Sequence, residues 1–564
     1  MIGKNLKQLI ADELNGENAV NLVRELTYYW RSPGSSGYKA AAETLKRTLA
    51  AIGLEVTSVD TPLDNRTPIG NYRFTPLAWE PIDAELKVIE PEERMLVSFA
   101  NAPVCINSWS GATAPEGVEA EIVYVGRGTS EEDYEGKDVR GKVVFTDTGY
   151  SWRVHSLAVE QRGALGFVND DINEIPYAKT REMFPDFVLW NTLYEQQLDG
   201  QPNKGWGLCI SPRMGDYLRG LLQQGPVKVY ARVITKMFEG VMENPMGIIE
   251  GSTYPDEEVL LMSHLDHPRP AAIDNAAGCA HITEVARAIN TLIERGAIER
   301  PKRTLKFFYG PEGHHANVYF DKLEKEGVLD RVICVLSSHC GGDPNLLRGP
   351  LTLTRNSVGT PSFLDDVVID FIEDVPAVFP SPGPRANTPF AYKAEPRFMG
   401  GDSLQVVGWG VPGIEMARRP NIFWHTPFDT YEKTSAEEFL KCGYIFAMAA
   451  LSIANAGLVG AVQIMSNATA RATTRLGETG RAAREEVVAT EASARPSLLE
   501  QRVDKLEYLF ERDSAAIAST LRLVVHESTA DRATAQAECD TLLARLERAK
   551  NEEIAALEAF ARWL

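Results

Sequence analysis

The chain has 564 residues, 44% hydrophobic and 24% charged, as expected of a folded globular protein with several domains. Its net charge of −20 argues against nucleic acid or an anionic membrane as a general partner. No stretch approaches the roughly 20 apolar residues of a membrane helix, and the seven cysteines lack the spacing of a disulfide framework, so we expect a cytoplasmic protein with reduced cysteines.

Two amphipathic helices and a strand open the chain. Apolar spacing predicts one helix over about residues 17–32 and a second over 38–52, with a strand starting at Leu54. A Gly- and Ser-rich segment, 31–37, separates the helices and offers serine N-caps. This order of elements predicts the start of an α/β domain.

The pattern changes between about residues 85 and 239. Short β-like runs, such as 120–126 and 141–145, are separated there by Gly, Pro and Asp. Strand–helix alternation resumes only near Met246. We therefore expect a β-rich domain over 85–239, inserted into an α/β domain that is made of residues 1–84 and 240–458.

The resumed segment contains apolar strands that end in polar loops. The runs expected to form these strands are Val259–Met262, Thr304–Tyr309, Val332–Leu336 and Val411–Met416. Open α/β sheets bind their ligands at the carboxyl ends of such strands. We predict a doubly wound mixed sheet with one active edge and a last helix over 435–457.

Beyond residue 459 the composition shifts to Ala, Arg, Glu and Leu. Apolar residues recur at helical spacing from Leu499 to Phe510 and from Leu542 to Phe560, across a break near 526–531. We predict a helical hairpin or bundle over 459–564. Its apolar stripes fit either packing within the chain or homo-oligomerisation.

Histidines and carboxylates gather at the predicted strand ends. His264 follows one strand, Asp274 lies in the small-residue turn after it, His339 follows another strand, and His425 stands in a later loop. Imidazole and carboxylate together suit zinc or a similar divalent ion. The sequence therefore predicts a metal site at this edge.

In order along residues 20–457, these motifs resemble the M28 family of zinc aminopeptidases, in the subgroup with an inserted protease-associated (PA) domain. The resemblance is carried by His264-x-Asp266, Asp274-Asn-Ala-Ala-Gly278, Glu312-Gly313, Asp402 and His425-Thr-Pro-x-Asp429-Thr. It implies that His264 and His425 each bind a metal, that Asp274 bridges the two, and that Asp266 orients His264. It also implies a zinc-peptidase type of sheet, one or two zinc ions or another divalent metal, and hydrolysis of a peptide or amide bond by water that the metal activates.

Two positions depart from the family pattern. The family has a Glu-Glu pair, of which the first is the general base and the second a metal ligand. This chain has Pro311-Glu312, so the resemblance implies that Glu312 binds a metal and that the usual base is missing. The family's Asp ligand is also absent. His339, 27 residues after Glu312, is our substitute ligand, with Cys340 and Asp343 as alternatives.

The missing base leaves three hypotheses open. Glu312 has become the base, at the cost of a metal ligand; or His314 or His315 deprotonates the water; or the chain is a non-catalytic binding or assembly protein. We favour an enzyme because the other site residues of the family are all present, at 264, 266, 274, 312 and 425.

Substrate recognition is also predicted from these motifs. We expect Asp402 to line the site, and Arg418 and Arg419 to hold a substrate carboxylate. The substrate implied by the resemblance is a peptide with a free amino terminus, with a small amide as the alternative. We expect His281 to pack inside its helix, and His267 to reach at most the entrance of the site.

Overall fold

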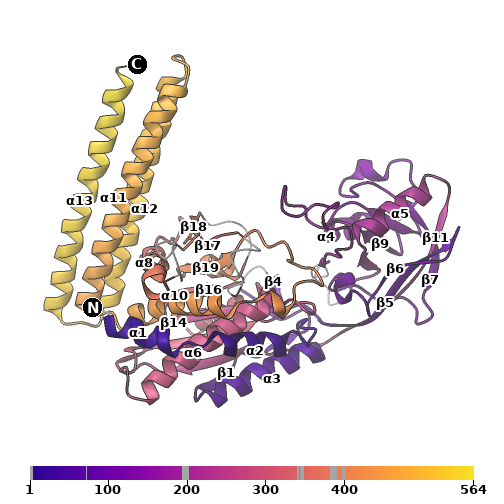
Figure 1. Cartoon of the computed structure of the whole chain (residues 1–564), viewed down its shortest axis with the longest axis horizontal. Coiled ribbons are helices and arrows are strands. Elements are labelled where there is room, and N and C mark those ends of the chain that lie inside the picture. Colours follow the sequence, from indigo (N-terminus) through magenta and orange to yellow (C-terminus); the bar gives the residue numbers. More distant parts are fainter. Residues whose placement is uncertain are drawn as a thin grey trace.

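The computed structural model describes residues 4–70, 73–193, 202–339, 342, 349–380, 390–396 and 401–563. Two large sheets and a helical arm follow one another across the molecule (Figure 1). This arrangement confirms the predicted class, a mixed α/β sheet with a second β-rich part and C-terminal helices. Among the described helices, none is both long and apolar enough to cross a membrane.

The central sheet has eight strands, in the order β1-β13-β15-β14-β16-β19-β17-β18. Its four inner strands, from β15 to β19, run parallel to one another. Antiparallel pairs at β1–β13, β13–β15 and β17–β19 make the sheet mixed. The strands are β1 (Glu55–Ser58), β13 (Pro245–Ile249), β14 (Tyr254–His264), β15 (Arg303–Gly310), β16 (Val332–Ser338), β17 (Leu351–Thr354), β18 (Tyr392–Glu395) and β19 (Gly413–Arg418).

Helices cover both faces of this sheet. Val259 and Leu261 of β14 pack in the core shared with α6 and α10, while Leu260 and Met262 pack toward α7 on the other face. Both sets of side chains are buried, which explains the uninterrupted apolar run of this strand. The helices are α1 (Lys4–Glu13), α2 (Gly16–Leu26), α3 (Ser36–Ala51), α6 (Ala277–Glu294), α7 (His315–Lys325), α8 (Leu364–Val378), α9 (Asp402–Gly408) and α10 (Ala436–Ala454).

The first long helix is shorter than expected. Apolar spacing predicts a helix to about residue 32, but α2 ends at Leu26. Arg31 instead pairs with His267, Arg31 N donating to His267 O at 2.9 Å and His267 N to Arg31 O at 3.2 Å. A contact between residues so distant in sequence overrides the local helical pattern.

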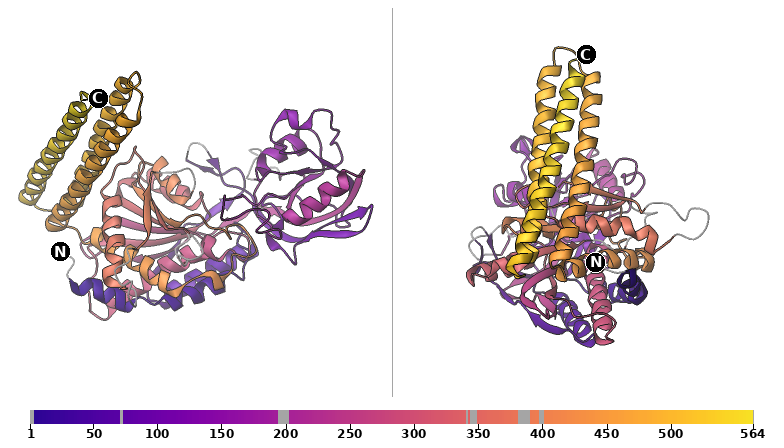
Figure 2. Two further views of the ribbon diagram at one scale, coloured as in Figure 1. Left: turned by 45° about the horizontal axis from the view of Figure 1, so that its top comes forward. Right: turned by 90° about the vertical axis from the view of Figure 1, so that its left-hand side faces the viewer.

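A second sheet lies between β1 and β13 in the chain and beside the central sheet in space (Figure 2). We call the segment that forms it, residues 78–238, the insert. Its strand order is β10-β9-β8-β7-β11-β5-β6, and α5 (Pro212–Leu222) packs against it. The strands are β5 (Ala78–Glu90), β6 (Arg94–Ser98), β7 (Val118–Tyr124), β8 (Val143–Thr146), β9 (Gly166–Asn169), β10 (Trp206–Cys209) and β11 (Val227–Phe238).

The start of the insert differs from the boundary expected at residue 85. Strand β5 begins at Ala78 and pairs with β11 from that residue onward. Pro81 within this strand resembles a turn signal, so the sequence pattern alone does not show that the strand starts before residue 85. The change shifts seven residues from the first part of the chain to the second sheet.

The C-terminal residues form a bundle of three helices that projects from the body (Figure 2). They are α11 (Leu458–Ala489), α12 (Arg495–Ala518) and α13 (Thr529–Ala561). Leu476, Leu506 and Leu546 are fully buried between them. Arg475 ties the bundle to α8 through Asp366 at 2.7 Å. The bundle therefore packs on its own chain as well as on itself.

Candidate metal centre

The candidate site lies where parallel strands end. Strand β14 ends at His264, and β16 ends one residue before His339. Since these strands are neighbours and run in the same direction, their last residues meet at one edge of the sheet. Asp274 comes to the same edge from the loop that leads into α6.

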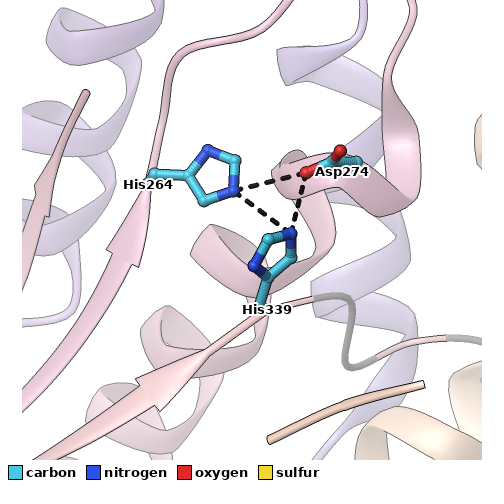
Figure 3. A group of neighbouring side chains, drawn as sticks. All are labelled: His264, Asp274 and His339. Atoms are coloured by element: carbon cyan, nitrogen blue, oxygen red, sulfur yellow. Dashed lines mark hydrogen bonds and ion pairs between the residues drawn. The ribbon is translucent and has the colours of Figure 1, made fainter. Parts of the chain in front are cut away.

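His264, Asp274 and His339 form a first group of possible metal ligands (Figure 3). One oxygen of Asp274, Oδ1, lies 3.3 Å from His264 Nε2 and 3.0 Å from His339 Nε2. The two histidine nitrogens are 3.5 Å apart. All three side chains are buried. The structure thus brings the substitute ligand expected at His339 together with two residues that the family motifs carry.

A second group uses the other oxygen of the same carboxylate. Asp274 Oδ2 lies 3.2 Å from His267 Nε2 and 3.3 Å from His425 Nε2. The three ligand atoms are close enough to share one ion. Asp274 therefore stands between two pairs of histidines, with one oxygen directed at each pair.

His267 is the member of this group that the sequence analysis did not select. Its position three residues after His264 is the one sequence signal for this role, because a loop after a strand can bring a second side chain back to the same edge of the sheet within a few residues. The loop itself is held by Arg31, whose guanidinium donates to Leu265 O at 2.8 Å and to Ala271 O at 2.9 Å. Only the tertiary contact with Arg31 shows where His267 points.

Hydrogen bonds fix the turn that carries Asp274. The carboxylate of Asp429 accepts from Ile273 N at 3.1 Å and from Asp274 N at 3.2 Å. The Asn275 side-chain amide donates to Ser338 O at 3.0 Å. Gly278 is required here because a Cβ at its position would lie 2.2 Å from Asn275 Oδ1.

Further carboxylates lie behind the histidines of the first group. Asp266 Oδ1 is 3.3 Å from His264 Nδ1 and accepts from Glu312 N at 2.7 Å. On the other side, Glu415 Oε1 is 3.8 Å from His339 Nδ1. A carboxylate that faces the second nitrogen of a ligating imidazole orients the ring and raises its basicity.

The insert supports the second group. Trp190 N donates to His425 O at 2.7 Å, and its indole packs against both His267 and His425 with ring centroids 4.7 and 4.6 Å away. His425 has a φ of 63°, a left-handed conformation that is uncommon for residues with a Cβ. The hydrogen bond from Trp190 helps to hold this conformation.

Electrostatics favour a cation at Asp274. Burial alone lowers the pKa of His264, but the carboxylates of Glu312, Asp266 and Asp274 outweigh it and raise that pKa well above its usual range. Burial likewise raises the pKa of Asp274, yet the surrounding histidines keep it well below its usual range. Burial lowers the pKa of His425 to about 3, so its imidazole is neutral at pH 7. An ionised carboxylate between imidazoles is the donor set that zinc prefers.

A cavity of about 670 Å³ opens onto both groups. Its wall includes Asp274, Glu312, His339 and His425 from the central-sheet side, and Lys179 and Trp190 from the insert. The volume is typical of sites for small molecules or short peptides. The insert thus supplies one wall of the space in front of the possible ligands.

The candidate bases occupy different places. Glu312 is exposed, lines the cavity and belongs to neither ligand group. His314 also lines the cavity, and its Nδ1 lies 3.0 Å from Glu312 O. His315 is fully buried outside the cavity wall, with Nδ1 2.7 Å from Pro311 O, and burial lowers its pKa to about 4.

The expected substrate-binding residues are less available than their sequence positions indicate. Arg418 lines the cavity, but its guanidinium is already taken up by an ion pair with Glu438. Arg419 donates to Glu415 at 3.2 Å. Asp402 is buried behind the cavity, where it accepts from Gly313 N at 3.2 Å, and burial raises its pKa to about 8.

Three further expectations concern single residues. His281 of α6 is buried as expected, with its Nδ1 2.7 Å from Ser338 Oγ. Cys340 and Asp343, the alternatives to His339, lie outside the described residues.

A family model matches the segment that carries most of the possible ligands. The model of Peptidase family M28 matches residues 244–310. Aminopeptidase NAALADL1 of Rattus norvegicus and of Mus musculus are each 36% identical over 64 residues, which is 11% of this chain and 8% of those proteins. The chain thus matches less than a tenth of the length of these relatives.

Similar solved structures cover much more of the chain. The zinc aminopeptidase BSAP from Bacillus subtilis has a TM-score of 0.55 at 16% identity, over 77% of this chain and 94% of that one. The aminopeptidase from Aneurinibacillus sp. strain AM-1 has a TM-score of 0.51 at 19% identity, over 78% and 95%. The peptidase M28 precursor from Shewanella amazonensis has a TM-score of 0.56 at 18% identity, over 80% and 98%. The chain has the fold of the M28 zinc aminopeptidases, and its residues 244–310, with His264, His267 and Asp274, match the sequence pattern of that family.

Proposed function

We propose that the chain is a metal-dependent hydrolase of peptide or amide bonds that holds two zinc ions on either side of Asp274. The observation that carries this proposal is the division of one carboxylate between two pairs of histidines, each within 3.3 Å of its own oxygen. Two neighbouring cations need such a shared anion to offset their mutual repulsion. The relatives named above as aminopeptidases support the same class of reaction.

The ligand sets are unusual. His264, Asp274 and His339 would hold one ion, and His267, Asp274 and His425 the other. With three protein ligands each, both ions keep an open position, as catalytic rather than structural zinc sites do. Bound zinc supplies a Lewis acid that polarises a substrate carbonyl and lowers the pKa of water toward about 7.

Glu312 fits the role of general base. Its carboxylate is exposed and lines the cavity, and the second ligand group contains His267 and not Glu312. Glu312 would take the proton of the attacking water and pass it to the leaving amine. His315 is buried outside the cavity wall, which makes it the weaker alternative.

The chain divides into three parts under this proposal. The hydrolase domain is expected over residues 1–84 and 240–458, the PA-like domain over 85–239, with β5 extending it back to Ala78, and the helical region over 459–564. The insert supports the site through Trp190. Self-association through the C-terminal helices stays a prediction, which light scattering of the purified protein would test.

Glu312→Gln tests the function and the base together. The zinc-loaded wild type should hydrolyse members of a panel of aminoacyl anilides and short peptide amides. The variant should retain both zinc ions and lose about 10²–10⁴-fold in kcat, the usual contribution of a general base. His314→Gln, in the same wall, removes the other candidate base that lines the cavity, and it should keep the wild-type kcat. Full activity of Glu312→Gln would refute its role, and a zinc-loaded wild type that hydrolyses no substrate would refute the function.

A further inference from the structure

One basic side chain in the cavity wall forms no ion pair within the described residues. Lys179 belongs to the insert, lines the cavity and is fully buried. Within the described part of the chain, its Nζ has no hydrogen-bond partner and no ion pair. Two backbone hydrogen bonds of 2.8 Å with Ile175, one in each direction, fix the segment that carries it.

An unpaired ammonium group is costly to bury. A buried charge is ordinarily matched by an opposite charge or by several hydrogen bonds. Burial lowers the pKa of Lys179 to about 8, although the carboxylate of Asp171 partly opposes this shift, so most molecules still carry the charge at pH 7. A ligand that enters the cavity with a negative charge would satisfy it.

The other two basic residues of the cavity wall are already matched. Arg418 pairs with Glu438, and Arg419 donates to Glu415. Among the described residues of this wall, Lys179 is thus the cation without a carboxylate. Lys179 of the insert is therefore a better candidate than Arg418 or Arg419 for binding a substrate carboxylate.

Lys179 also lines the same cavity as the second ligand group. Trp190, which contacts His425, lies in the same cavity wall as Lys179. A substrate positioned with its scissile bond at the ligands would therefore place another part against the amine.

We propose that Lys179 binds a carboxylate of the substrate, so that the hydrolase selects short peptides or amides that carry a negative charge beside the scissile bond. The inference rests on the proposed function. Two sources share this chemistry, an acidic side chain and a free carboxyl terminus. Both would form a charge-assisted hydrogen bond with the amine in a space shielded from water.

Paired substrates that differ only in charge test this inference. Ala-Glu amide against Ala-Gln amide reports on a side-chain carboxylate, and Ala-Ala-Ala against its amide reports on the terminal one. For at least one pair, the zinc-loaded wild type should favour the charged member by about 10–100-fold in kcat/KM, as expected for one charge-assisted hydrogen bond. Lys179→Met should reduce that preference to about one.

Two further variants control for folding and for charge in general. Lys179→Gln keeps a polar tip, and it should lose the preference as Lys179→Met does. Lys87→Met removes a half-buried lysine of the insert that pairs with Glu93, and it should keep the wild-type preference. Thermal unfolding of both Lys179 variants should match or exceed the wild type, because each removes an unpaired buried charge.

The outcomes separate this inference from the hydrolase proposal. Equal rates within both pairs, unchanged in Lys179→Met, would refute the inference while leaving hydrolysis established. If zinc-loaded protein cleaves none of the peptides, the hydrolase proposal fails, and calorimetric binding of the same pairs decides the inference. A binding preference for a charged member that Lys179→Met removes would support it, and equal or undetectable binding would refute it.

Discussion

Replacing His267 with alanine is expected to release the second zinc ion while the first stays bound. His267 Nε2 lies 3.2 Å from Asp274 Oδ2, on the side of the carboxylate that faces away from the first group. Zinc sites with four protein ligands bind with about 10–16 kcal/mol, or about 2.5–4 kcal/mol for each ligand. Losing one of three ligands should thus weaken the second ion by about 10²–10³-fold, since 1.4 kcal/mol corresponds to a factor of ten.

The assay is a competitive zinc titration against a chromophoric chelator, with the zinc content of the protein measured after dialysis. Wild type should show two zinc ions for each chain, and His267→Ala one. His314→Ala is the matched control, because it removes a histidine from the same cavity wall outside both ligand groups. Two ions bound by His267→Ala with unchanged affinity would show that His267 is not a ligand.

Two further predictions concern residues around the site. Trp190→Ala should weaken the second ion by about 10–100-fold in the same titration and leave the first unchanged, because the indole packs against two ligands of the second group, His267 and His425. Equal weakening of both ions would contradict this. Burial lowers the pKa of His281 to about 4, against about 6.5 in the unfolded chain, so the unfolded state binds the extra proton between these values. Stability is therefore fully present above pH 6.5 and falls by up to about 3 kcal/mol as pH drops to 4. Urea unfolding of metal-free protein should show a smaller fall for His281→Gln, and an identical fall would refute the assignment.

Much of the first ligand group follows from the sequence because its residues stand at strand ends. The apolar runs predict parallel strands, and parallel strands bring their carboxyl ends to one edge, so His264 and His339 meet although they are 75 positions apart in the sequence. Asp274 follows from its motif. These positions depend on helices and strands, and helices and strands can be recognised from the pattern of apolar residues in the sequence.

The remaining features depend on contacts between distant segments. His267 is placed by Arg31, and His425 is supported by Trp190 of the insert. Arg418 resembles an available cation in sequence, but Glu438 of α10 pairs with it. Lys179 lies in an irregular segment of the insert, and nothing local shows that it reaches the cavity. Such contacts have no period, so they become visible only in the folded chain.

The central claim is that Asp274 shares its two oxygens between two zinc ions. A crystal structure of the zinc-loaded protein, with anomalous data collected at the zinc absorption edge, tests it most directly. We predict two anomalous peaks, one among His264, Asp274 and His339 and the other among His267, Asp274 and His425. A single peak, or a zinc ion bound by Glu312 in place of His267, would contradict the claim.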